Sequence, residues 1–429
     1  MKGMHAFAPT WIAEYDLAEP GRAPAPPPGG RHVDARVLVR LHGHPLGYIQ
    51  IPVADDRLEE VEAVARGAFG AEVRRHLAGD GLGDSDLHLD RSRWPGLPCS
   101  AALLRTTDAP PRISVVVCTR ARADQLRFCL ASVLRQSIPA NEVVVVDGGV
   151  TGETERLLAD LADERLRYVR EPVAGLSRAR NTGMRLAMGE VVVFTDDDVR
   201  ADEHWLAWLV SALRRAPRVG LATGLVPSAE LESHAQAMLD LRVSWGSGFE
   251  SRLYDVGENH PGTPFFPYSA GVFGTGANFA LTRAAIADVG EFDEALGASS
   301  PSAGGEELDM FLRVIKRGWT IAYEPAAVVW HYGQREMDIV HQMRSYGRGL
   351  GAYAFKHITR GGGGDMARHV PSALARLVTE RRASAEGRRM PLRLRVAELV
   401  GLAQGPCGYV RGLRRVRAIR SGPPALPRS

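Results

Sequence analysis

Short apolar runs that alternate with helical segments dominate the chain from Arg112 to about residue 226. The runs ISVVVC, EVVVVD and EVVVFT are apolar throughout, as expected of strands that are buried on both faces of a sheet. Segments with helical periodicity, such as LSRARNTGMRLA, separate them. This alternation predicts an α/β domain built on a doubly wound, mostly parallel sheet.

The residues that end the apolar runs are the first candidates for a binding site, because ligands of such sheets lie beyond the carboxyl ends of the strands. These strand-end residues are Cys118, Thr119, Arg120, Asp147, Asp196, Asp197 and Asp198. Asp147 either caps the turn DGG or accepts a hydrogen bond from a nucleotide. Arg178 and Arg180 are either solvated helix charges or donors to a nucleotide. Two further candidates for substrate binding are Asn181 and Asn278.

Three consecutive carboxylates follow the strand EVVVFT, at Asp196–Asp198. Neighbouring carboxylates repel one another unless a positive charge lies between them. One interpretation is an N-cap cluster for the following helix. The other is an Asp-x-Asp pair that holds Mg²⁺ or Mn²⁺, hard cations that prefer oxygen ligands and bridge to phosphate. The position at the ligand edge of the sheet favours the metal.

Two motifs in the second half of the chain carry further candidates. GGEELDMFLR presents Glu306, Glu307 and Asp309 after a double glycine. These acids either cap a helix or place a general base at its start. His331 closes the apolar run AVVWH, and it is either a core histidine or an imidazole ligand to the metal.

Together these motifs resemble those of a family 2 glycosyltransferase with the GT-A fold, of the non-processive, bacterial type. The resemblance covers about Arg112 to Gly333 and follows the order ISVVVCTR, EVVVVDGG, GLSRARNTG, FTDDD, GTGANFALTR, FDEALG, GGEELDMFLR and EPAAVVWH. It implies an inverting transfer of a sugar from a nucleoside-diphosphate sugar to an acceptor hydroxyl, with Mn²⁺ or Mg²⁺ as cofactor.

The resemblance also implies roles for individual residues. Thr119, Arg120 and Asp147 would hold the nucleoside, with Arg180 nearby. The metal and diphosphate would lie at Asp196, Asp198 and, as in some relatives, His331. The general base would be Glu307, for which Glu306 and Asp309 are competitors.

Two departures from the family pattern concern these roles. The catalytic pair that the family usually writes Glu-Asp is Glu306-Glu307 here, which makes the side chain of the base longer by one methylene. The loop DGGVTGET replaces a more common Asn/Ser-rich version. The Gln-x-x-Arg-Trp motif of processive synthases is not found, which favours addition of a single sugar.

Composition shifts divide the chain into four predicted parts. We expect a flexible N-terminal segment (1–30), a small α+β domain made of a hairpin and a helix (31–108), a GT-A domain (109–358) and a basic helical C-terminal region (359–429). Within the GT-A domain we expect a nucleotide-binding half (109–226) and an acceptor half (227–358).

The C-terminal region offers a second possible contact. LRLRVAELVGLAQG and YVRGLRRVRAI set apolar residues at helical spacing among arginines. One interpretation is a pair of helices packed on the catalytic domain with a solvated basic face. The other is peripheral attachment to anionic lipid at the inner face of the cell membrane, which would suit a lipid-linked acceptor.

Net charge and cysteine content limit the cellular location and the partners that we expect. The formal net charge is only +3, and no two of the four cysteines form a CxxC pair. No signal peptide is recognisable, and no apolar run approaches the roughly 20 residues that span a bilayer. We therefore expect a reduced, cytoplasmic protein with no nucleic-acid partner.

Two other functions compete with sugar transfer. A nicotinamide oxidoreductase would carry G-x-G-x-x-G after the first strand, where CTRARADQ has no glycine. A non-catalytic nucleotide-sugar sensor or scaffold on the same fold is the main alternative, and Glu307 in place of aspartate is its only sequence support.

Overall fold

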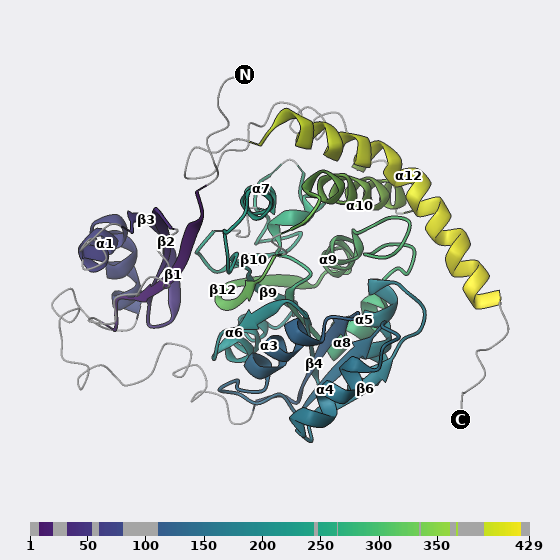
Figure 1. Cartoon of the computed structure of the whole chain (residues 1–429), viewed down its shortest axis with the longest axis horizontal. Helices are drawn as coiled ribbons and strands as arrows, with labels where there is room; N and C mark the ends of the chain where they lie inside the picture. Colours follow the sequence, from purple (N-terminus) through teal and green to yellow (C-terminus); the bar gives the residue numbers. More distant parts are fainter. Residues whose placement is uncertain are drawn as a thin grey trace.

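The protein is described here by a computed structural model of the chain. The described residues are 8–19, 32–53, 60–79, 110–243, 248–263, 265–333, 336–360, 366–367 and 390–421. Figure 1 shows a small N-terminal domain beside a large α/β domain, with a long C-terminal helix along the outside.

The small domain contains the predicted hairpin and helix. β2 (Asp34–Leu41) and β3 (His44–Pro52) pair antiparallel around the turn His42-Gly43, and α1 (Val61–Gly79) packs on them. A third strand, β1 (Thr10–Asp16), pairs parallel with β2. Its residues had been predicted to belong to a flexible segment, and for them that prediction is wrong. Ala13 and Tyr15 alternate into the domain core, so β1 buries one face while it covers an open edge of the hairpin.

The main sheet has the strand order β10-β12-β9-β11-β7-β4-β5-β6, and β8 pairs with β12. Its strands are β4 (Ile113–Thr119), β5 (Glu142–Asp147), β6 (Leu166–Arg170), β7 (Val191–Asp196), β8 (Val199–Ala201), β9 (Val219–Leu225), β10 (Arg252–Tyr254), β11 (Asn278–Thr282) and β12 (Thr320–His331). Strands β4 to β7 are mutually parallel, and β9 is parallel to β12. Strand β11 runs antiparallel between β7 and β9.

Helices cover both faces of this sheet. On one face lie α3 (Ala123–Val133), α4 (Glu153–Leu161) and α6 (Trp205–Leu213). On the other lie α5 (Leu176–Leu186), α8 (Arg283–Val289) and α9 (Glu306–Lys316). The predicted fold class is confirmed: a doubly wound, mostly parallel α/β sheet with a small N-terminal α+β domain and a helical C-terminal region.

The small domain contacts the large domain next to β8, the short strand that follows Asp196–Asp198. Arg40 of β2 is buried and forms ion pairs with Asp202 (2.6 Å) and Glu14 (2.7 Å). Asp202 also accepts a hydrogen bond from the indole N–H of Trp330 in β12. Through Asp202, the small domain therefore contacts the paired strands β8 and β12.

Of the described C-terminal residues, 392–421 form one continuous helix, α12 (Leu392–Ser421), where the sequence suggested two helical segments. It crosses α10 (Ile339–Arg360) at glycines (Figure 1). A Cβ at Gly401 would lie 2.0 Å from the carbonyl oxygen of Arg344, so only glycine permits this approach. Among the described residues, no helix is long and apolar enough to cross a membrane.

Candidate functional site

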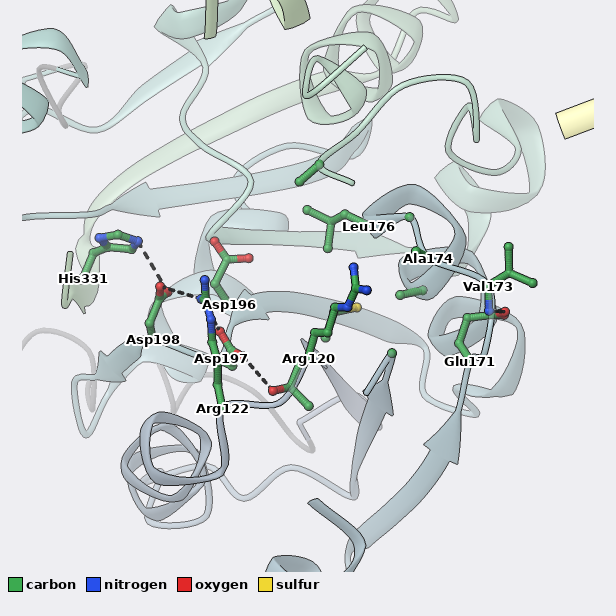
Figure 2. A pocket seen from close by; sticks show the side chains of 16 residues that line it. Arg120, Arg122, Glu171, Val173, Ala174, Leu176, Asp196, Asp197, Asp198 and His331 are labelled. Carbon is green, nitrogen blue, oxygen red and sulfur yellow. Dashed lines mark hydrogen bonds and ion pairs between the residues drawn. The ribbon is translucent and has the colours of Figure 1, made fainter. Parts of the chain in front are cut away.

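A cavity of about 320 Å³ opens at the carboxyl ends of β4, β5 and β7, where the strand-end rule placed the site. Figure 2 shows the acidic residues and His331 at one end and the loop between β6 and α5 at the other. The cavity is lined by Cys118, Thr119, Arg120, Arg122, Gly148, Glu171, Val173, Ala174, Gly175, Leu176, Ala179, Asp196, Asp197, Asp198, Ala298 and His331. This lining combines the three aspartates and His331 at one end with Glu171 and mostly small and apolar residues at the other (Figure 2).

Three possible metal ligands converge at the acidic end of the cavity. Asp196, Asp198 and His331 each offer one ligand atom, and these atoms lie within 4.8 Å of one another. The β8–β12 pairing brings His331 to Asp198, with 3.4 Å between Nε2 and Oδ1. Burial raises the pKa of Asp196, and the charge of Asp198 adds to the rise against the opposing charge of Arg180. Carboxylate and imidazole donors of this kind fit Mn²⁺ or Mg²⁺.

The middle aspartate of the acidic run has a different environment. Asp197 accepts a hydrogen bond from the hydroxyl of Thr119 (2.6 Å) and one from Arg122 (3.3 Å). It lies outside the cluster of possible ligands and ties the ends of β4 and β7 together. Asp197 and Thr119 both line the cavity, so the hydrogen bond between them fixes part of its wall.

Arg180 joins the acidic cluster to the start of α9. Its buried guanidinium donates to Asp196 (3.3 Å), to Glu306 (3.0 Å) and to the carbonyl oxygen of Gly276 (2.9 Å). The sequence allowed a solvated helix charge or a contact to the nucleoside. The structure places Arg180 between the carboxylates of Asp196 and Glu306.

The three acids of α9 lie in three different environments. Glu306 is buried against Arg180, whereas Asp309 is fully buried and pairs with Lys356 (2.6 Å), Arg313 (2.8 Å) and His357 (2.9 Å). Glu307 is half-buried and, among the residues that the structure describes, forms no ion pair. Burial raises the pKa of Glu307 to about 8, and the charge of Glu306 adds to the rise.

The predicted competitor Asp309 thus has no access to the cavity. Although burial works in the opposite direction, the hydrogen bond from His357 and the charges of Arg313 and Lys356 hold the pKa of Asp309 well below its usual range. Such a carboxylate is a poor proton acceptor. Of the three acids, only Glu307 combines partial exposure with a raised pKa.

Comparisons with known proteins agree with this arrangement. The family model described as "Glycosyl transferase family 2" matches residues 114–271. A PGL/p-HBAD biosynthesis glycosyltransferase of Mycobacterium bovis is 30% identical over 184 residues, which cover 42% of this chain and 68% of the relative. The chain belongs to glycosyltransferase family 2.

Two further similarities extend beyond the matched region. A pre-mycofactocin glycosyltransferase of Mycobacterium tuberculosis is 28% identical over 323 residues, and the match spans 69% of this chain but only 63% of that relative's length. A solved mannosyltransferase from Pyrobaculum calidifontis, in complex with GDP-Man and Mn²⁺, is 20% identical and covers 77% of this chain and 82% of its own. Its TM-score is 0.38, too low to support inference about the site.

Four residues that were candidates for substrate binding contact other parts of the protein instead. Asn278 is buried, accepts from the indole of Trp205 and donates to the carbonyls of β9 and β12. Asn181 both donates to and accepts from the backbone of Phe292. Arg178 pairs with Glu171 and Glu294. Asp147 accepts the N–H of Gly149 (2.7 Å), which is the turn-capping alternative for that residue.

Two charged residues that line the cavity escaped the sequence analysis. Arg122 lies 3.3 Å from both Asp197 and Asp198, and Glu171 accepts hydrogen bonds from the Val173 amide and Thr182. Both residues line the cavity and follow strand ends, β4 and β6. Applying the strand-end rule to the short strand LRYVR would have indicated Glu171.

The opposite environments of Asp309 and Glu307 predict opposite effects of pH on stability. Asp309→Asn should lower the free energy of unfolding at pH 7 by about 3–5 kcal/mol, because the cations Lys356 and Arg313 lose a buried anionic partner. The pKa of Asp309 is lower in the folded protein than the value of 3.8 expected in the unfolded chain, so ionised Asp309 stabilises the fold above pH 3.8. This contribution is lost as the pH falls below that value. Urea unfolding should show that Asp309→Asn loses less unfolding free energy at pH 3 than at pH 7.

Glu307→Gln is the matched variant, for which we expect an increase in stability at high pH. Ionisation of the half-buried Glu307 opposes folding, so its cost should appear between the usual pKa of 4.5 and the folded pKa of about 8. The variant should therefore melt at a higher temperature than the wild-type protein at pH 9 and at the same temperature at pH 4. Equal melting temperatures at pH 9 would contradict the raised pKa.

Proposed function

We propose that this protein transfers a single sugar from a nucleoside-diphosphate sugar to an acceptor hydroxyl, with inversion at the sugar carbon. One observation carries the proposal: Arg180 links the acidic end of the strand-edge cavity directly to the helix that presents Glu307. A nucleotide donor in the cavity would have its diphosphate near Asp196 and Asp198. The reacting sugar would then lie between these residues and Glu307.

The three converging ligands support a divalent cation. Asp196, Asp198 and His331 would hold Mn²⁺ or Mg²⁺, since two carboxylates and an imidazole within 4.8 Å of one another match the donors these ions accept. When bound, the ion would neutralise negative charge on the diphosphate leaving group. At the other end of the cavity, the loop from Glu171 to Leu176 would enclose the nucleoside.

Glu307 is the proposed general base. The acceptor hydroxyl oxygen would form a bond to the anomeric carbon of the sugar as the bond from that carbon to the diphosphate oxygen breaks. Glu307 would take the hydroxyl proton, and the nucleoside diphosphate would leave with the bonding electrons. A single displacement from the opposite face inverts the anomeric centre. The neighbouring Glu306, paired with Arg180, raises the basicity of Glu307.

The names of the relatives support transfer chemistry but not a particular substrate. Both relatives from mycobacteria are called glycosyltransferases, and the match to the first spans 63% of that protein. The sugar and the nucleotide are therefore left open. A nucleotide-sugar sensor would share the cavity, and turnover distinguishes the two functions.

The first test removes a metal ligand. Asp198→Ala should abolish the Mn²⁺-dependent part of nucleotide binding, because Asp198 contributes one of the three converging ligands. Isothermal titration with UDP and with GDP, each with and without Mn²⁺, would measure this. Asp309→Asn serves as a control that changes a buried acid elsewhere and should retain the metal dependence. Wild-type-like binding by Asp198→Ala would contradict the metal assignment.

The second test concerns the base. Glu307→Gln preserves the shape of the side chain and removes its basicity, so turnover should fall by about 10²–10⁴-fold while donor binding is retained. In the wild-type protein, the rate should rise with pH and level off above about 8, where Glu307 is ionised. Release of nucleoside diphosphate from an array of nucleotide sugars measures both effects. Full activity in Glu307→Gln would assign the proton transfer to another group.

We also propose that the outer face of α12 contacts anionic lipid on the cytoplasmic side of the membrane, where a lipid-linked acceptor would be presented. Leu392, Val396 and Val400 are 72%, 47% and 42% exposed and recur every four residues. Exposed arginines continue along the helix at Arg411, Arg414, Arg417 and Arg420. Further along α12, Leu413 and Val416 pack inward against the buried cluster that contains Tyr409. Apolar and basic residues on one exposed side fit an anionic lipid surface.

Vesicle co-sedimentation tests this contact. Full-length protein should sediment with vesicles that contain phosphatidylserine at low salt, and less with vesicles of phosphatidylcholine alone. Replacing Leu392, Val396 and Val400 by serine should release it. Phe128→Ser on α3, which changes an apolar residue that is 73% exposed on another helix, is the matched control. No sedimentation of wild-type protein with anionic vesicles would refute the contact.

A further inference from the structure

Arg415, on the C-terminal helix α12, bridges two loops that come together at the nucleoside end of the cavity. Its guanidinium donates to the carbonyl oxygen of Ser299 (2.9 Å) and to that of Ala174 (2.7 Å). Ala174 lines the cavity (Figure 2). Ala298, the neighbour of Ser299, lines it too. A residue at the far end of the chain thus contacts the backbone of the cavity wall.

The same two loops also contact each other directly. The amide of Leu176 donates to the carbonyl oxygen of Ala298 (3.0 Å), and Ser177 donates to that of Leu296 (2.8 Å). One loop leads into α5, which carries Arg180, and the other leads to Gly305 and α9. The wall therefore adjoins both helices that supply the reacting end of the site.

Neighbouring residues of α12 keep Arg415 in place. Tyr409 donates from its hydroxyl to Asp293 (2.9 Å). A Cβ at Gly412 would lie 2.5 Å from the carbonyl oxygen of Ala295, and one at Gly408 would lie 2.7 Å from that of Pro301. The helix is therefore in direct contact with the segment 293–301, and Arg415 is not a mobile surface arginine.

The backbone of this segment needs such restraint. Ser299 and Ala303 have φ angles of 61° and 63°, in the left-handed region that residues with a Cβ rarely adopt. Such conformations persist only where the surroundings hold them. The hydrogen bond from Arg415 to the carbonyl of Ser299 is one of these restraints.

We propose that Arg415 is a positioning residue for donor binding, which holds the Ala174 and Ser299 loops together as one wall of the cavity. This inference rests on the proposed function, since it assigns the wall to the nucleoside part of the donor. Arginine suits the role because its planar fork presents donors in two directions at once. A lysine at this position would donate to only one of the two carbonyl oxygens at a time, so it would replace the arginine only in part.

The proposal is tested with Arg415→Ala, Arg415→Lys and the control Arg393→Ala, which removes an exposed arginine from the first turn of α12. Hydrogen–deuterium exchange without ligand should be faster in residues 173–177 and 297–304 of Arg415→Ala, and unchanged in Arg393→Ala. Nucleotide affinity, measured with UDP and GDP in the presence of Mn²⁺, should fall about 5- to 30-fold, as expected of a coupling between two sites. Arg415→Lys should be intermediate.

Further measurements separate positioning from general destabilisation. The KM for the nucleotide sugar should rise in Arg415→Ala with kcat little changed, and the melting temperature should stay close to that of Arg393→Ala. Unchanged exchange in both loops, or nucleotide affinity equal to that of the wild type, overturns the role of Arg415 alone. If the wild-type protein binds neither nucleotide with Mn²⁺, the proposed function fails, and with it the assignment of this wall to a donor.

Discussion

A single buried guanidinium holds the candidate site together. Arg180 lies on α5, yet it contacts Asp196 at the end of β7 and Glu306 at the start of α9, which are 110 residues apart in the chain. Without this positive charge, the carboxylates at the two positions would repel one another across a poorly solvated space. The position of Glu307 relative to the acidic cluster depends on this contact.

The two terminal regions support this arrangement from opposite sides. Arg40 of the small domain reaches Asp202, which also holds Trp330, the residue before His331. At the other end of the cavity, Arg415 of α12 reaches the backbone of Ala174. Both regions lie outside the residues 114–271 that match the family model.

The acids of α9 show that the surroundings of a carboxyl group determine its pKa. Glu307 and Asp309 are two residues apart on one helix, but the pKa of Glu307 is raised to about 8 while that of Asp309 is held well below its usual range. Asp309 faces His357 and Lys356 of α10, and Glu307 faces the carboxylate of Glu306. Residue type and spacing make all three acids possible bases, and the neighbours from α5 and α10 distinguish them.

The sequence by itself determined the alternation of strands and helices and the residues at the strand ends, because both depend on local periodicity and chain direction. Thr119, Arg120, Asp196 and Asp198 were found in this way, and they line one cavity. Only the tertiary structure decided that Asn278 is a core residue and that Arg180 lies between carboxylates. It alone showed that residues 10–16 form a strand and that Arg415 reaches the cavity wall. These outcomes depend on partners more than 15 positions away, and a pattern within a short window carries no information about such partners.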